Sequence, residues 1–186
     1  MKLLLVDDHQ IFRDSLIDFL KKESFCDAID GASSTEEAKE RISDSVPDVL
    51  VTDLSLPEES GMELLRWAQA EHPDIRTACL TMHAELNVLQ EALEQGVSGF
   101  VTKSSGYDEL VSCITQVAKG GNYLDQVMLR KVFQHFRQRP TAPIEGREIL
   151  SDLTEREREI FFLLLKDYNL SAISERLYIS PKTVEN

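Results

Sequence analysis

Short apolar runs that alternate with segments of helical periodicity constrain the fold of this chain most. Residues 3–6 form a continuous apolar run typical of a buried strand, and Phe12, Leu16 and Phe19 follow it at helical spacing. The alternation continues to about residue 119 and predicts a doubly wound α/β domain with a five-stranded parallel sheet. The other predicted strands lie at residues 25–29, 48–52, 75–80 and 99–101.

Several predicted helices start with the pattern of a capping box. In this motif a serine and an acidic residue three positions later satisfy each other's free backbone N–H groups. The pattern occurs at Ser34 and Glu37, at Ser60 and Glu63, and at Ser105 and Asp108.

The character of the sequence changes after residue 122. A basic amphipathic stretch predicts a helix at residues 127–139, and the prolines and glycine of residues 140–146 are typical of a linker. Beyond it, Thr154 and Ser180 are expected to cap helices of a small all-α domain. We therefore predict a first domain at residues 1–122, a linker with a helix at 123–150 and a second domain at 151–186.

Charge is divided unevenly along the 186 residues. The chain has a formal net charge of −13, with −14 in residues 1–125 and +1 in residues 126–186. The acidic part is not expected to bind nucleic acid or an anionic membrane, but it could attract a metal cation. Apolar runs are too short for a signal peptide or a membrane span, which favours a cytoplasmic protein with no membrane partner. The three cysteines are far apart and suggest neither disulfides nor a zinc site.

Polar residues with useful chemistry follow the predicted strands. Asp7 and Asp8 come after the first, Asp53 after the third, Thr81 after the fourth and Lys103 after the fifth. Ligands of open parallel sheets bind at the carboxyl ends of the strands, so these side chains are expected to meet at one edge. Each alone is more often structural, but together they predict a Mg²⁺ (or Mn²⁺) site. Asp53 could then attack a phosphoryl group, with Lys103 neutralising the charge of the transition state.

In their order and identity these motifs resemble those of a response-regulator receiver domain, which has a flavodoxin-like fold. The matching segments are residues 5–9, 53–57, 61–65, Thr81 and 99–103. The resemblance implies that Asp53 accepts a phosphoryl group from a sensor histidine kinase and later loses it to water. It therefore implies a phosphoacceptor protein, whose chemistry is self-phosphorylation and autodephosphorylation, and not a turnover enzyme.

The resemblance also implies a set of metal ligands. Asp8 and Asp53 would bind Mg²⁺ directly, Asp7 mainly through water, and Ser55 through its backbone carbonyl. We interpret His9 as a helix-start residue and not as a ligand.

Further roles are implied for residues around the phosphoryl pocket. Thr81 would hydrogen-bond the phosphoryl group, and the Phe100 ring would move into the space that Thr81 leaves. The flanking residues Ser55, Met82 and His83 are expected to tune the lifetime of the phosphoryl group.

Residues 151–186 resemble the helix-turn-helix output domain of NarL/LuxR-type regulators. A recognition helix would start at residues 180–181 and place its side chains in the major groove of DNA. It would stop roughly two turns short, and the fourth helix of such domains is missing, so we expect an incomplete domain whose DNA binding is weak or lost. The expected DNA contacts are Lys182, Thr183, Glu185 and Asn186.

Together these features predict a response regulator in which phosphorylation promotes a homodimer and switches a transcription-regulatory output. An alternative is a receiver that controls protein interactions without DNA binding. A Mg²⁺-dependent aspartyl-phosphate phosphohydrolase is less favoured, because such enzymes usually have Asp-x-Asp after the first strand and this chain has adjacent Asp7 and Asp8.

Overall fold

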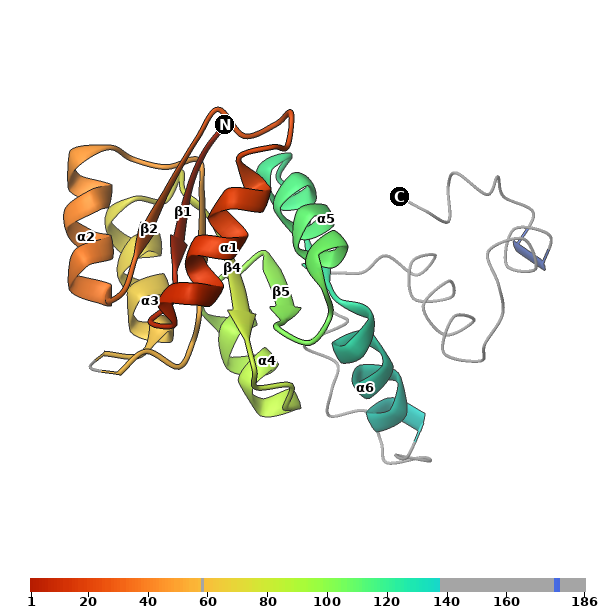
Figure 1. Cartoon of the computed structure of the whole chain (residues 1–186). Coiled ribbons are helices and arrows are strands. Elements are labelled where there is room, and N and C mark those ends of the chain that lie inside the picture. Colours follow the sequence, from red (N-terminus) through yellow and green to blue (C-terminus); the bar gives the residue numbers. More distant parts are fainter. Residues whose placement is uncertain (58, 138–175, 178–186) are drawn as a thin grey trace. The chain divides into compact units, whose positions relative to one another are not determined.

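The computed structural model describes residues 1–57, 59–137 and 176–177. The chain divides into two compact units, Met1–Arg130 and Lys131–Asn186. Beyond residue 137 only Arg176 and Leu177 are described, and both are helical. The linker at 140–146 and the helix starts at Thr154 and Ser180 lie outside the described residues. The described elements (Figure 1) are β1 (Lys2–Val6), α1 (Gln10–Leu20), β2 (Ala28–Ala32), α2 (Thr35–Asp44), β3 (Val49–Thr52), α3 (Gly61–Glu71), β4 (Arg76–Thr81), α4 (Leu86–Glu94), β5 (Gly99–Thr102), α5 (Tyr107–Ala118), β6 (Tyr123–Leu124) and α6 (Gln126–Arg137).

The strands form one parallel sheet in the order β2-β1-β3-β4-β5-β6. This confirms the predicted doubly wound α/β fold. The sheet has six strands and not five, because Tyr123 and Leu124 pair in parallel with Gly99 and Phe100. Two residues are too short a run to be identified as a strand from periodicity.

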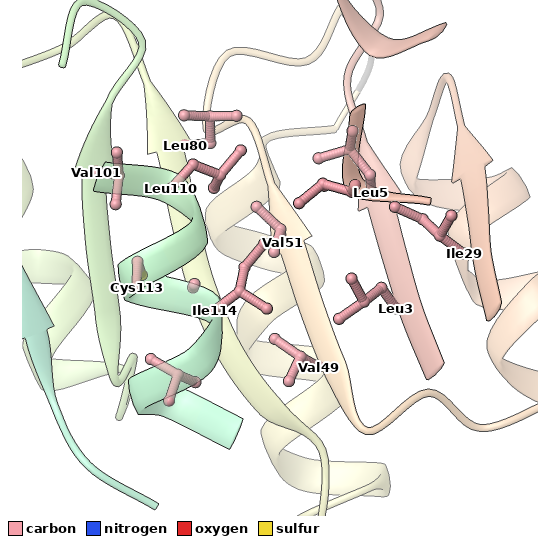
Figure 2. Close-up of a cluster of buried hydrophobic side chains, with 13 residues drawn as sticks. Leu3, Leu5, Ile29, Val49, Val51, Leu80, Val101, Leu110, Cys113 and Ile114 are labelled. Atoms are coloured by element: carbon pink, nitrogen blue, oxygen red, sulfur yellow. The ribbon is translucent and has the colours of Figure 1, made fainter. Parts of the chain in front are cut away.

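The core lies on both faces of the sheet. Figure 1 shows α1 and α5 in front of the strands and α3 behind them. Alternate residues of a strand point to opposite faces. Leu3 and Leu5 therefore pack with Ile114 of α5 in one cluster (Figure 2). Leu4 and Val6, also buried, belong to the opposite face. Burial on both faces explains why these strands are continuous apolar runs and do not alternate with polar residues.

Two of the three predicted helix starts are correct. Ser60 and Glu63 form a complete capping box at α3. Ser34 caps α2 by accepting the Glu37 N–H, but the Glu37 carboxylate accepts hydrogen bonds from Ser33 and Arg41 instead of the Ser34 N–H.

The prediction at Ser105 is wrong. Helix α5 has Gly106 at its N-cap, without a side-chain cap, and the Ser105 hydroxyl donates to the buried Asp125 carboxylate. A hydrogen bond to an ionised carboxylate is stronger than the neutral hydrogen bond that an N-cap serine makes. The Ser105 hydroxyl therefore binds Asp125 and does not cap α5.

The helix predicted at residues 127–139 is observed as α6, although residues 138–139 lie outside the described part. Among the described helices, none is long and apolar enough to cross a membrane.

Candidate functional site: an acidic cluster with a lysine

The parallel register brings the carboxyl ends of the central strands to one edge. Val6 of β1 pairs with Thr52 of β3, so the residues that follow them, Asp7 and Asp53, are neighbours. The backbone strengthens this arrangement, because the Asp53 N–H donates to Val6 O at 2.8 Å. Lys103 follows β5 at the same edge, as the sequence predicts.

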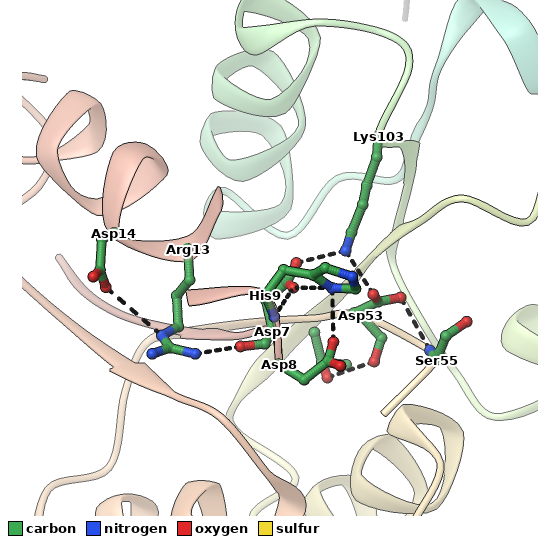
Figure 3. A network of polar contacts seen from close by, with 9 residues as sticks. Asp7, Asp8, His9, Arg13, Asp14, Asp53, Ser55 and Lys103 are labelled. Atoms are coloured by element: carbon green, nitrogen blue, oxygen red, sulfur yellow. Dashed lines mark hydrogen bonds and ion pairs between the residues drawn. The ribbon is translucent and has the colours of Figure 1, made fainter. Parts of the chain in front are cut away.

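The Lys103 ammonium joins two of the carboxylates (Figure 3). Its Nζ lies 2.6 Å from Asp53 Oδ2 and 2.7 Å from Asp7 Oδ2, and all three side chains are at least nine-tenths buried. Burial alone would lower the pKa of Lys103, but its contacts with Asp53 and Asp7 outweigh this and raise the pKa above its ordinary value. The ammonium therefore stays charged at neutral pH.

Asp8 and His9 complete a cluster in which a metal ion could be held. One ligand atom from each of Asp7, Asp8, His9 and Asp53 lies within 4.8 Å of the others. Asp7 Oδ2 and Asp8 Oδ1 are buried, and their near neighbours are the Lys103 ammonium at 2.7 Å and His9 Nδ1 at 2.9 Å. Buried carboxylate oxygens of this kind suit Mg²⁺, so the residues fit the predicted cation.

His9 lies at the start of α1, as predicted, and also contacts the acidic cluster, which the sequence does not predict. It is the N-cap of α1, as predicted, but makes no side-chain cap. Its Nδ1 lies 2.9 Å from Asp8 Oδ1 and 3.3 Å from Asp7 Oδ1, so the ring belongs to the cluster (Figure 3). The sequence does not predict a role for Arg13, whose guanidinium donates to the Asp7 carbonyl and fixes the backbone there. The spacing of Arg13 within an amphipathic helix gives no signal of that contact.

Backbone groups hold Asp53 from the other side. The Ser55 N–H donates to Asp53 Oδ1 at 3.0 Å, so both carboxylate oxygens of Asp53 have partners. Gly61, the first residue of α3, lies so close that a Cβ there would be 1.8 Å from Asp53 O. Glycine is therefore required where α3 starts against the end of β3.

The remaining predicted residues lie just beyond β3 (Ser55), at or just beyond the end of β4 (Thr81, Met82 and His83) and within β5 (Phe100). Thr81 is buried at the end of β4, and its hydroxyl accepts the His83 N–H at 3.1 Å. Phe100 is buried in β5, while the Met82 and His83 side chains are exposed. The predicted DNA contacts Lys182, Thr183, Glu185 and Asn186 lie outside the described residues.

An open parallel α/β sheet with an acidic cluster and a buried lysine at its carboxyl edge is the arrangement expected of a receiver domain. Comparison with known families agrees. Residues 3–115 match the family described as "Response regulator receiver domain", and residues 151–186 match "Bacterial regulatory proteins, luxR family". The chain therefore belongs to the response regulators that combine a receiver with a LuxR-type domain. These are transcription-regulating proteins and not classical enzymes.

Individual relatives support the same placement. The chain is 32% identical over its whole length to the DNA-binding transcriptional activator DevR/DosR of Mycobacterium tuberculosis, of which it covers 84%. It is 28% identical, again over its whole length, to the transcriptional regulatory protein DegU of Brevibacillus brevis, of which it also covers 84%. A LuxR-family two-component response regulator from Aurantimonas has a similar structure, with a TM-score of 0.69 and 29% identity over 73% of this chain and 97% of that chain.

Proposed function

We propose that Asp53 accepts a phosphoryl group from a sensor histidine kinase and that this modification switches a DNA-binding output. The observation that carries the proposal is the Lys103 ammonium, which lies between the buried Asp53 and Asp7 carboxylates next to Asp8. Three carboxylates and one ammonium leave the cluster negatively charged, which is the environment that a divalent cation requires.

The residues have distinct tasks in the transfer. An Asp53 oxygen attacks the phosphorus, the bond to the kinase histidine breaks, and an acyl phosphate forms on Asp53. Mg²⁺, held by Asp8, Asp53 and the Ser55 carbonyl, with Asp7 acting through water, would neutralise the phosphoryl oxygens. Lys103 stays charged and stabilises the same oxygens from the β5 side.

The switch would use Thr81 and Phe100. Phosphorylation of Asp53 adds acceptor oxygens toward which the Thr81 hydroxyl can turn, in exchange for its bond to the His83 N–H. Phe100 forms part of the wall of a mostly apolar pocket of about 190 Å³ between α4 and the β5–β6 edge. On phosphorylation the ring would move from this position into the space that Thr81 leaves. Ser55, Met82 and His83 flank the site and would tune the lifetime of the phosphoryl group.

The LuxR-type residues 151–186 would carry the output, as in the DNA-binding relative DevR/DosR. The contacts proposed for Lys182, Thr183, Glu185 and Asn186 predict salt-sensitive binding to DNA when the helix-turn-helix domain is complete, and weak or no binding by the 186 residues alone. We also propose that phosphorylation promotes a homodimer. Sedimentation velocity with Asp53 fully modified should show the dimer, and a monomer under these conditions would reject it.

Intact mass spectrometry after incubation with acetyl phosphate tests the phosphoacceptor directly. One phosphoryl adduct should form with Mg²⁺, and it should be lost in Asp53→Asn. Asp74→Asn, at an exposed position, is the matched control and should be modified like the wild type. An unmodified wild type, in a reaction that modifies another receiver, would refute the proposal.

A further inference from the structure

Asp125 is a buried carboxylate that the phosphoryl chemistry above does not use. It lies between β6 and α6 and is fully buried. An ionised group is costly to bury unless several hydrogen bonds replace its water. Four donors do so here, and they come from β5, from the β5–α5 loop and from α6.

The two oxygens of Asp125 have different partners. Oδ2 accepts the Thr102 N–H at 2.6 Å, the Thr102 hydroxyl at 2.7 Å and the Ser105 hydroxyl. Oδ1 accepts the Met128 N–H at 2.8 Å, which caps the first turn of α6. The carboxylate thus joins the end of β5 and the loop after it to the start of α6.

These bonds act on the residue next to Lys103. On the β4 side of β5, the Lys103 N–H donates to Thr81 O at 2.8 Å. On the β6 side, the N–H and the hydroxyl of Thr102 donate to Asp125. The Lys103 side chain leaves β5 between these two anchors, and its ammonium contacts both Asp53 and Asp7.

The charge of Asp125 strengthens this link. Burial alone would raise the pKa of Asp125, but the hydrogen bonds from Ser105, Met128 and Thr102 lower it below its ordinary value. Asp125 is therefore ionised at neutral pH, and hydrogen bonds to an ionised acceptor are about twice as strong as neutral ones.

We propose that Asp125 is a positioning residue for Lys103 and that it mechanically connects the phosphoacceptor site to α6. The part that concerns phosphoryl transfer rests on the proposed function. A displacement of the lysine backbone by about 1 Å can slow a reaction up to 10²-fold. The hydrogen bonds of Asp125 connect the site to α6, and α6 is connected through the chain to residues 151–186. A change at the phosphoacceptor site could therefore be transmitted to the LuxR-type segment.

Two substitutions disturb the link in different ways. Thr102→Val removes the hydroxyl at nearly constant shape and charge and leaves the α6 cap in place. Asp125→Asn presents an NH₂ group to donors that need an acceptor. It therefore disturbs both the bonds from Thr102 and Ser105 and the cap of α6. Ser34→Ala removes the N-cap of α2 and is the control for loss of stability alone.

Two readouts should move in opposite directions. Phosphorylation by acetyl phosphate, followed by intact mass, should slow about tenfold in Thr102→Val and Asp125→Asn. Mg²⁺ should bind about three- to tenfold more tightly by titration calorimetry, because a displaced ammonium no longer competes for Asp7 and Asp53. Thr102→Ser should restore both values. A loss of stability alone would lower both the phosphorylation rate and the Mg²⁺ affinity. Ser34→Ala measures how large that effect is.

A Lys103→Met background sharpens the test. If Asp125 acts through Lys103, adding Asp125→Asn to Lys103→Met should change the remaining phosphorylation rate by less than about twofold. An independent tenfold loss in that background, or Mg²⁺ affinities equal to the wild type in both single variants, would overturn the inference. An unphosphorylated wild type would instead refute the proposed function, and the Mg²⁺ titration would still decide the role of Asp125.

Discussion

Replacing Gly61 by alanine should destabilise the receiver, although alanine is the better helix former. Helix propensity favours alanine over glycine by up to about 1 kcal/mol. At the first residue of α3, however, the added Cβ would lie 1.8 Å from Asp53 O and 2.8 Å from Asp53 C, both backbone atoms. Cβ contacts essentially never fall below 3.0 Å, so α3 and the end of β3 must separate by more than about 1 Å.

The expected size follows from this displacement. Overpacking of a tight site costs about 1–3 kcal/mol, which exceeds the gain in propensity. A shift of about 1 Å at Asp53 should also slow phosphoryl transfer by about 10²-fold. Trp67, the only tryptophan of the chain, lies on α3 and reports unfolding by fluorescence in urea.

Gly96→Ala separates this clash from ordinary backbone strain. Gly96 has a φ of +76°, but the nearest atoms to its added Cβ are 3.7 Å away on the Gln69 side chain. It should lose about 1 kcal/mol and keep the wild-type phosphorylation rate. The reasoning is refuted if Gly61→Ala unfolds at the wild-type urea concentration or above and is phosphorylated at the wild-type rate.

Three further predictions concern caps, charges and the cation. Ser60→Ala should lower the free energy of unfolding by about 1 kcal/mol in urea, because the capping box is lost; no change would show that solvent replaces it. The bond from Arg41, aided by Ser33, lowers the pKa of Glu37 to about 2 from 4.5, so Glu37 stabilises the fold above pH 4.5 and this is lost as pH falls toward 2. Solvent screening reduces the effect to about 0.5 kcal/mol; Glu37→Gln should show that deficit in urea at pH 7 and converge with the wild type near pH 2, and a constant difference would contradict the cause. Mg²⁺ at ten times its Kd should raise the free energy of unfolding by about 1.4 kcal/mol, EDTA should reverse this, and an unchanged urea midpoint would argue against a cation in the cluster.

The positions of Asp7, Asp53 and Lys103 could be predicted because a parallel sheet converts sequence order into a shared edge. Each follows a recognisable strand, and the pairing of Val6 with Thr52 places the first two side by side. No contact needs to be known for that inference.

The contacts of Ser105 could not be predicted in the same way. A serine three residues before an acid fits a capping box, but the outcome depends on Asp125, which lies 20 residues later in the chain. Asp125 reaches the site through β6, whose two residues leave no periodic pattern. Asp125 itself carries a usable signal, because an aspartate directly before a helical stretch is a common N-cap.

Charge balance explains why one fixed ammonium stands among three carboxylates in the site. Asp7 and Asp53 are buried, and buried carboxylates need compensation, which a single Lys103 supplies only in part. On the proposed mechanism, phosphorylation replaces the single charge of Asp53 by roughly two, so the demand on Lys103 rises when the switch is used. Because Thr102 connects Lys103 to Asp125, a stronger pull on the ammonium acts on the residue that caps α6. A lysine that only neutralised charge would not need the hydrogen bonds that tie Thr102 to Asp125. A lysine that also transmits the phosphorylation of Asp53 to α6 would need them.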